Sequence, residues 1–189
     1  FTVGLIKAVY SFQNRSIGDN ELAEKACQIE IEDLKRNVGK QDQYSSVFGG
    51  INSYTFSKKG VLVQPLKISK QVLEKLEDNL CLFFTKFSRS ADSILKKQDT
   101  QTKKKNKKII ENLMFNKALG IKSKKLLESG KLGDFAEILN EQWRCKFERS
   151  PETINQRIRF LYNLGLNNGA LGGKLVGAGG GGFLLFYAE

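Results

Sequence analysis

The chain ends in the stretch KLVGAGGGGFLLFYAE, Lys174 to Glu189, in which five of the six residues from Gly177 to Gly182 are glycine. Apolar runs flank the glycines on both sides, which is not typical of a flexible linker. Glycine is needed where a backbone approaches another group closely or adopts a positive φ angle. We therefore predict a glycine loop between two strands, with exposed amides that face an anion, most simply phosphate.

Two common phosphate-binding motifs do not fit this loop. The letters GAGGGG formally satisfy G-x-G-x-x-G, but the dinucleotide fingerprint requires a helix after the glycines. FLLFY, Phe183 to Tyr187, is instead typical of a strand. A P-loop of the Walker type would need Lys-Ser or Lys-Thr after its last glycine, and neither pair follows. The stretch therefore predicts an anion-binding loop of another class.

The composition of the 189 residues narrows the chemistry. The hydrophobic content of 40% is enough for a sizeable core. The chain has three cysteines without a C-x-x-C pair, which argues against a zinc site and indicates a reducing cytoplasm. Histidine is absent, so Ser-His and Cys-His nucleophiles are excluded. No apolar run approaches the ~20 residues of a membrane span, and no signal peptide opens the chain. We expect a soluble, cytoplasmic protein without a membrane partner.

The net charge of +11 points to an acidic partner, either nucleic acid or a phosphorylated small molecule. The alternative is that the charge serves no specific partner. Much of the charge lies in KKQDTQTKKKNKK, Lys96 to Lys108, which contains no aromatic residue. Nucleic-acid-binding segments usually interleave aromatic and basic residues. We interpret the run as solvated surface and expect no nucleic-acid partner.

The periodicity of the chain predicts the α+β class. Helical periodicity covers residues 1–12, 20–36, 70–79, 88–97, 108–129, 131–148 and 151–164. Strand-like runs are INSYTF (51–56), VLVQPL (61–66), CLFFTK (81–86) and the two flanks of the glycine loop. SKKG, 57–60, predicts a hairpin turn. A domain boundary is predicted near residue 75, where a new strand and helix series follows the hairpin.

One carboxylate of the predicted helix 20–36 stands in an unexpected place. At 100° per residue, Glu30 falls within an apolar stripe. The stripe consists of Leu22, Ala23, Ala26, Cys27, Ile29 and Leu34. A carboxylate on a buried face is costly unless it is paired, hydrogen-bonded or bound to a metal. Two interpretations stay open: Glu30 has a lysine partner or faces a solvated cleft at the end of the stripe, or it is a magnesium ligand.

The segment NVGKQDQYSSVFGG, 37–50, predicts a glycine-bounded loop that offers five functional side chains in succession. These are Lys40, Gln41, Asp42, Gln43 and Tyr44. Loops placed on a rigid scaffold often carry functional sites. The alternative is a polar helix start in which Asp42 caps the following turn.

Four motifs, in order along nearly the whole chain, resemble those of the GHMP kinases, the superfamily of galactokinase, homoserine kinase, mevalonate kinase and phosphomevalonate kinase. GGKLVGAGGGGFLLF is similar to their third motif, and CQIEIEDLKRNVGKQDQYSSVFGGIN to their Glu-helix and catalytic-Asp segment. Together with FTKFSRSADSIL and EQWRCKF, the set most resembles the D-glycero-D-manno-heptose 7-phosphate kinases.

The resemblance implies roles for individual residues. Asp42 matches the catalytic aspartate, which orients or deprotonates the sugar hydroxyl, and Glu30 matches the carboxylate on Mg²⁺. The residues that match the glycine-rich loop near the ATP phosphates and the sugar are Gly177, Ala178, Gly179, Gly180, Gly181 and Gly182. Lys40 would steady the transferring phosphate, although a solvated lysine is an equal alternative.

Four further residues are expected at the substrate. Gln43 and Tyr44 follow the catalytic aspartate directly. Arg89 in FSRSAD and Lys146 in WRCKF resemble positions where the heptose kinases keep cations, so one of them would hold the 7-phosphate of the sugar. Surface salt bridges are the alternative for both cations.

The resemblance implies a kinase that uses ATP and Mg²⁺ to phosphorylate the anomeric hydroxyl of a heptose 7-phosphate, for nucleotide-activated heptose and lipopolysaccharide synthesis. Phosphoryl transfer needs mainly positioning and charge neutralisation, so the lack of histidine is no obstacle. Three alternatives stay open: a GHMP kinase of fucose or galactose type, a non-catalytic relative, and a basic nucleic-acid-binding module, which would bind any duplex in a salt-dependent manner. The oligomeric state stays open, and a homodimer is one option.

The resemblance also implies a two-domain GHMP kinase fold with the active site between the domains. Residues 1–75 would form the rear of the N-terminal domain and residues 76–189 a ferredoxin-like C-terminal domain. The family's Gly-Ser-rich phosphate loop would precede Phe1, and a last strand and helix would follow Glu189. We therefore expect a fragment of a longer fold that has little or no kinase activity alone.

Overall fold

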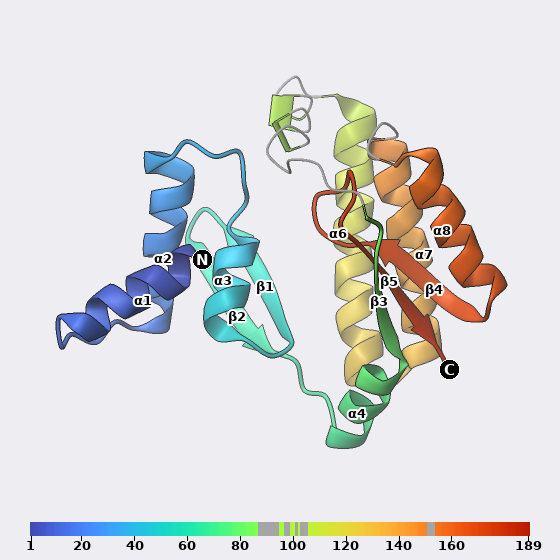
Figure 1. The fold of residues 1–189 in the computed structure, drawn as a ribbon, viewed down its shortest axis with the longest axis horizontal. Coiled ribbons are helices and arrows are strands. Elements are labelled where there is room, and N and C mark those ends of the chain that lie inside the picture. Colours follow the sequence, from blue (N-terminus) through green and yellow to red (C-terminus); the bar gives the residue numbers. More distant parts are fainter. Residues whose placement is uncertain (87–94, 97–98, 101, 103–105, 151–153) are drawn as a thin grey trace. The chain divides into compact units, whose positions relative to one another are not determined.

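The computed structural model describes residues 1–86, 95–96, 99–100, 102, 106–150 and 154–189. The chain forms two compact units, Phe1–Leu66 and Lys67–Glu189 (Figure 1). The division falls before the boundary predicted near residue 75, because the segment ahead of that residue is already bound to the second unit. The amide of Lys67 donates to Glu128 Oε1 at 3.2 Å, and Lys75 pairs with Glu189 at 2.9 Å.

The first unit consists of helices followed by a hairpin. Its elements are α1 (Thr2–Phe12), α2 (Asp19–Cys27), η1 (Gln28–Asp33), α3 (Gln41–Phe48), β1 (Asn52–Ser57) and β2 (Gly60–Pro65). The two antiparallel strands meet at Ser57 and Gly60, which confirms the turn predicted at 57–60. Gly60 has a φ of 124°, a value that disfavours any residue with a side chain. Ile6, Tyr10 and Leu22 join α1 to α2 in the core.

The helix predicted over 20–36 is confirmed to Asp33, but its second half is not an α-helix. The α-helix ends at Cys27, and η1 continues it as a π-helix, in which the amide of Leu34 donates to the carbonyl of Ile29 at 2.9 Å. A π turn is wider than an α turn, so the phase of 100° per residue is lost. Leu34 is therefore 56% exposed rather than part of the apolar stripe, whereas the first four members of the stripe are buried as predicted.

The loop predicted over 37–50 is wrong at its centre, which forms α3, so the helix start given as the alternative is confirmed. Asp42 lies in the first turn of this helix, where a carboxylate interacts favourably with the helix dipole. It does not cap the helix: the N-cap residue is Lys40, and no side chain makes a capping hydrogen bond. Gly49 and Gly50, with φ of 59° and 60°, end α3 before β1 begins.

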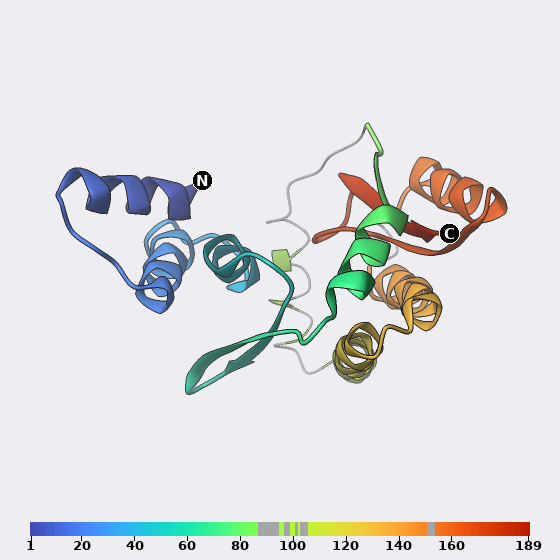
Figure 2. The ribbon, with the colours of Figure 1, turned by 90° about the horizontal axis from the view of Figure 1, so that it is seen from below.

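The second unit contains a three-stranded antiparallel sheet in the order β3-β5-β4. Its elements are α4 (Lys70–Asn79), β3 (Leu80–Phe84), α6 (Lys107–Glu128), α7 (Leu132–Arg149), α8 (Gln156–Asn167), β4 (Ala170–Leu175) and β5 (Phe183–Ala188). α6 and α7 pack side by side and are seen nearly end-on in Figure 2. The α+β class is confirmed. The ferredoxin-like arrangement, which has four strands, stays a prediction.

The predicted elements of this unit agree closely with the structure, with two qualifications. The strands, and the helices at 70–79, 108–129 and 131–148, are confirmed within a few residues. The helix predicted at 151–164 begins later, at Gln156, because Asn155 caps it by accepting from the amide of Ile158 at 2.8 Å. Most of the helix predicted at 88–97 lies outside the described residues.

Close approach of backbones places β4 on α7. A Cβ atom built on Gly172 would lie 1.8 Å from the carbonyl oxygen of Ala136, so only glycine fits this position. Behind this contact, Trp143 of α7 stacks on Tyr162 of α8 with ring centroids 4.1 Å apart. Both rings belong to a buried cluster that includes Phe186 of β5.

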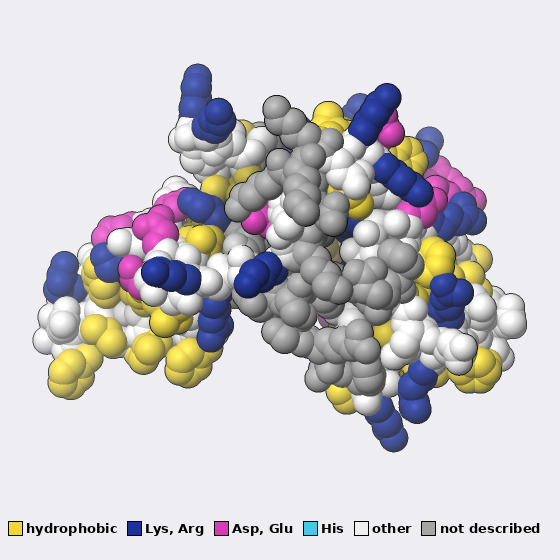
Figure 3. All heavy atoms as spheres, turned by 90° about the horizontal axis from the view of Figure 1, so that it is seen from above, with side chains coloured by type: hydrophobic (Ala, Val, Ile, Leu, Met, Phe, Trp, Pro, Cys, Tyr) yellow, Lys and Arg dark blue, Asp and Glu magenta, His cyan; other side chains and the backbone are white. Residues whose placement is uncertain are grey.

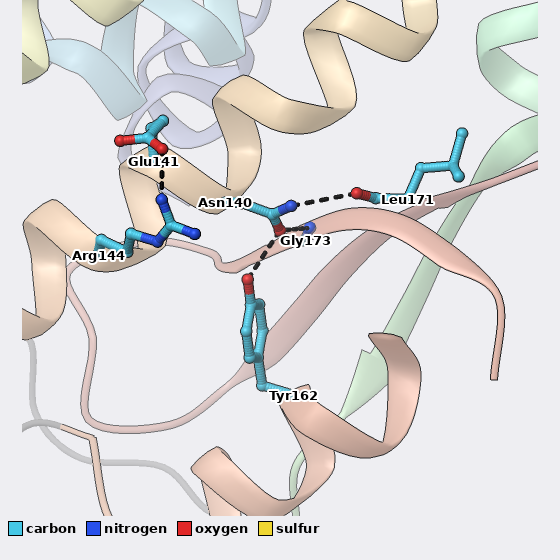
Figure 4. Close-up of polar contacts among 6 residues, drawn as sticks. All are labelled: Asn140, Glu141, Arg144, Tyr162, Leu171 and Gly173. Atoms are coloured by element: carbon cyan, nitrogen blue, oxygen red, sulfur yellow. Dashed lines mark hydrogen bonds and ion pairs between the residues drawn. The ribbon is translucent and has the colours of Figure 1, made fainter. Parts of the chain in front are cut away.

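Asn140 braces three elements of the second unit (Figure 4). Its Oδ1 accepts hydrogen bonds from the Tyr162 hydroxyl at 2.7 Å and from the Gly173 amide at 3.0 Å. Its Nδ2 donates to the Leu171 carbonyl at 3.1 Å. A single amide side chain thus joins α7, α8 and β4, the strand that leads into the glycine loop.

Candidate active site

The predicted site residues lie in both units, and each unit is described by itself. In the first unit, Asp42 occupies the first turn of α3 and its side chain is exposed. Its backbone carbonyl accepts from Ser46 Oγ at 2.7 Å. Among the described residues, no group donates a hydrogen bond to its carboxylate. The carboxylate is therefore available to a hydroxyl group of a substrate.

Glu24 of α2 is bound by two of the predicted site residues. Its Oε2 pairs with Lys40 Nζ at 2.6 Å, and its Oε1 accepts from the Tyr44 hydroxyl at 2.5 Å. The bond to Lys40, followed by that to Tyr44, lowers the pKa of Glu24. Tyr44 is 2% exposed, and burial, followed by the bond to Glu24, raises its pKa. The roles of Lys40 at the phosphate and of Tyr44 at the substrate stay predictions.

Sequence reasoning did not select Glu24, which lies outside the apolar stripe of the predicted helix. The partners of Glu24 lie 16 and 20 residues further along the chain. Helical periodicity relates positions three or four residues apart, so it gives no signal for such pairs.

Glu30 and Gln43 are brought together between η1 and α3. Gln43 Nε2 donates to Glu30 Oε2 at 3.1 Å, and Gln43 is only 5% exposed. Its other amide atom, Oε1, is buried without a hydrogen-bond partner among the described residues. Glu30 is half-buried, and its predicted role as a magnesium ligand stays a prediction.

The surroundings of Glu30 fit Mg²⁺ that arrives with a nucleotide. Magnesium is usually held by one or two protein carboxylates together with phosphate oxygens and water. Within the part of the chain that the structure describes, no group of three Asp, Glu, Cys or His side chains is arranged to hold a metal ion. A single carboxylate such as that of Glu30 would hold Mg²⁺ only together with phosphate oxygens and water, and this role stays a prediction.

In the second unit, the glycine loop connects the antiparallel strands β4 and β5, as predicted. The positive φ angles are 71° at Gly177, 111° at Gly179, 81° at Gly180, 133° at Gly181 and 91° at Gly182. The amide of Val176 donates to the Phe183 carbonyl at 2.9 Å and closes the loop. Among the described residues, no amide of 177–182 donates to a backbone carbonyl, although Gly179, Gly180 and Gly181 are buried, so the exposed amides predicted for this loop stay a prediction.

Lys146 of α7 is bound to the beginning of this loop. Its Nζ donates to the carbonyls of Leu175 at 2.8 Å and Gly177 at 2.5 Å. Burial lowers the pKa of Lys146 to about 7, and the nearby charges of Lys174 and Arg149 act in the same direction. Its role as a ligand of the sugar phosphate stays a prediction, and Arg89, the other candidate, lies outside the described residues.

No helix within the described ranges combines the length and apolarity that a membrane span requires.

Comparisons with known proteins agree with the motifs. A family model described as "GHMP kinases C terminal" matches residues 123–189. The chain is 37% identical, over 188 residues, to a Campylobacter jejuni protein named D-glycero-alpha-D-manno-heptose 7-phosphate kinase. The matched region is 99% of this chain and 55% of that protein.

Two solved structures resemble the chain over its whole length. One is a D-glycero-D-manno-heptose 1-phosphate kinase from Bacteroides thetaiotaomicron, which has a TM-score of 0.68 and 30% sequence identity to this chain. The match covers 99% of this chain and 50% of the Bacteroides chain. The other is a putative sugar kinase from Campylobacter jejuni, with a TM-score of 0.70, 34% identity, and coverage of 100% and 53%. The chain spans about half the length of these relatives. It has the mixed α+β fold of that half, and its residues 123–189 match the C-terminal region of the GHMP kinases.

Proposed function

We propose that the gene product that contains this chain is an ATP-dependent kinase, which transfers the γ-phosphate to the anomeric hydroxyl of a heptose 7-phosphate. The observation that carries the proposal is the 37% identity, across nearly the whole chain, with a protein named as a heptose 7-phosphate kinase. An exposed Asp42 and a glycine loop with unpaired amides support it. In this proposal the enzyme acts in the cytoplasm and supplies nucleotide-activated heptose for surface polysaccharides such as lipopolysaccharide.

In this proposal, different residues of the chain activate the acceptor hydroxyl, bind phosphate and hold the metal ion. Asp42 accepts the proton of the attacking hydroxyl or orients that hydroxyl toward the phosphorus atom. The amides of 177–182 bind anionic oxygens of phosphate. Glu30 would hold Mg²⁺, which neutralises phosphate charge when bound. Gln43 supports this task, because its amide holds one oxygen of the Glu30 carboxylate in place.

The test is phosphoryl transfer from Mg-ATP by the complete gene product, with a panel of sugars and sugar phosphates as acceptors. Asp42→Asn keeps the size of the side chain but removes the base, so turnover of heptose 7-phosphate should fall by about 10²- to 10⁴-fold. Asp19→Asn is the matched control, because Asp19 is also an exposed carboxylate in the first turn of a helix of the same unit. Its turnover should equal that of the wild type.

Two outcomes would overturn parts of the proposal. Full activity of Asp42→Asn would remove Asp42 from the chemistry. Turnover of heptose 1-phosphate instead of heptose 7-phosphate would reject the anomeric hydroxyl as the acceptor, and the name of the Bacteroides relative is the reason to include that compound.

A further inference from the structure

The start of α3 is held by contacts with α2 and η1 rather than by a side-chain cap. The chain leaves η1 at Asp33, passes through Lys35 with a positive φ of 51°, and enters α3 after Lys40 without a side-chain cap. A helix start that lacks a cap leaves its first amides unsatisfied, so contacts with other elements must fix its position. Those contacts therefore also decide where Asp42 lies.

The carboxylate of Glu24 supplies two such contacts, one from each oxygen. It binds Lys40 at 2.6 Å and Tyr44 at 2.5 Å, and these two residues are four positions apart, on one face of the first turn. Asp42 stands two positions after Lys40, so it is turned by about 200° around the helix axis and belongs to the opposite face. A change in the position of the bound face moves Asp42 with it.

The ion pair is suited to placing α3 rather than to stabilising the fold. The side chains of Lys40 and Glu24 are 41% and 44% exposed, and pairs at such exposure contribute little to stability. Tyr44 is held independently, since it packs with Ala23 and Cys27 in a buried cluster. Removal of the Glu24 carboxylate is therefore expected to leave the chain folded and to loosen the beginning of α3.

We propose that Glu24 is a positioning residue: it holds the first turn of α3 against α2 and thereby places the carboxylate of Asp42. This inference rests on the proposed function of Asp42 as the base. It assigns Lys40 to the placement of α3 and not to the transferring phosphate.

The first experiment measures amide hydrogen exchange in the 189-residue chain, which needs no catalytic activity. In Glu24→Ala, the amide of Tyr44, which donates to the Lys40 carbonyl at 3.3 Å, should exchange about 5-fold faster than in the wild type, because the first turn of α3 opens more often. Glu21→Ala is the control, since Glu21 is an exposed carboxylate on the same helix. Equal exchange in the two variants would overturn the proposal.

The second experiment separates kcat from KM in the complete gene product. Glu24→Gln and Lys40→Met should each lower kcat by about 10-fold, because a base displaced from its hydroxyl slows the chemical step. KM for both substrates should change by less than about 2-fold. The double variant should be no worse than either single one, because both remove the same contact. Additive losses with a raised KM for ATP would place Lys40 on the phosphate and overturn the proposal.

The proposed function and this inference fail in different ways. Full activity in Asp42→Asn rejects the proposed base, and the positioning role with it. Loss of activity in Asp42→Asn without any loss in Glu24→Gln rejects the positioning role of Glu24 alone.

Discussion

Lys146 is held in an unusual state for a lysine, since its pKa is lowered to about 7 while its Nζ binds two carbonyls at the glycine loop. Between about pH 7 and the ordinary value of 10.5, the unfolded chain binds a proton that the folded chain does not. The free energy of unfolding therefore rises with pH across this window, and the burial penalty is largest below it.

This sign gives a prediction for Lys146→Met. The stability of the wild type, relative to that of the variant, should increase between about pH 7 and about pH 10. Urea denaturation midpoints of both proteins across this range measure the difference. Lys122→Met, at an exposed position on α6, is the control and should show a constant difference. A constant difference for Lys146→Met as well would mean that its pKa is ordinary.

Single residues differ in how far sequence alone predicts them. Asp42 and Glu30 could be selected because a motif and an apolar stripe identify them, and the exposure of Asp42 and the half-burial of Glu30 agree with that selection. Glu24 could not be selected, because its importance comes from contacts across 16 and 20 residues. The hydrogen bonds of Lys146 to the loop backbone could not be predicted from the sequence either, since any carbonyl can accept a hydrogen bond from a lysine.

At the scale of elements, α7 and β4 are joined through Asn140. Asn140→Ala removes three hydrogen bonds and leaves the hydroxyl of Tyr162 and the amide of Gly173 without their acceptor. The free energy of unfolding should fall by about 3 kcal/mol, at about 1 kcal/mol for each bond. Glu141→Ala, which breaks only the exposed pair with Arg144 on the same helix, should cost less than about 1 kcal/mol. Equal losses in urea denaturation would contradict the bracing role.

Glycine has opposite effects in two elements. Gly172→Ala forces a Cβ into the backbone of Ala136 and should destabilise the chain by about 3 kcal/mol. Gly120→Ala, at an exposed position of α6 with open space around it, should stabilise the chain by about 1 kcal/mol. Thermal unfolding of the two variants beside the wild type tests this. A stabilised Gly172→Ala would show that β4 and α7 are further apart than described.

The errors in element prediction have one physical origin. Periodicity assumes a constant angle per residue, and η1 violates it, so the helix end and Leu34 were placed wrongly. In 37–50, polar residues and bounding glycines indicated a loop, but α2 and the hairpin supply the packing that Tyr44 and Phe48 need to form a helix. Helices with their own capping residues, and strands in which apolar and polar residues alternate, were predicted well, because neighbouring residues determine where these elements begin and end.

At the scale of the whole molecule, the net charge of +11 is not gathered into one basic stripe on the face drawn in Figure 3, where Lys and Arg are scattered among acidic and apolar side chains. Residues 97–98, 101 and 103–105 of the basic run lie outside the described residues, so the interpretation of this run as solvated surface stays a prediction. The family and α+β class were predictable because four motifs retain their order, whereas the division at Leu66 depends on contacts of α4 that no motif encodes.

The 189-residue chain alone should show little or no phosphoryl transfer. It spans about half the length of its relatives, and within the described residues the glycine loop is the part proposed to bind phosphate. A coupled assay of ADP release, run on the chain and on the complete gene product at equal concentration, measures this. Turnover by the chain at a rate comparable to that of the complete gene product would show that these residues suffice.

The π turn of η1 has a consequence for changes in chain length. Such a turn holds one residue more than an α turn, so deletion of a single residue within Gln28–Asp33 would let α2 continue as a regular helix. With a deletion ahead of Glu30, the side chain of Glu30 would rotate by about 100° around the helix axis and turn away from Gln43. A one-residue deletion here should therefore leave α2 helical and still break the contact between η1 and Gln43 of α3.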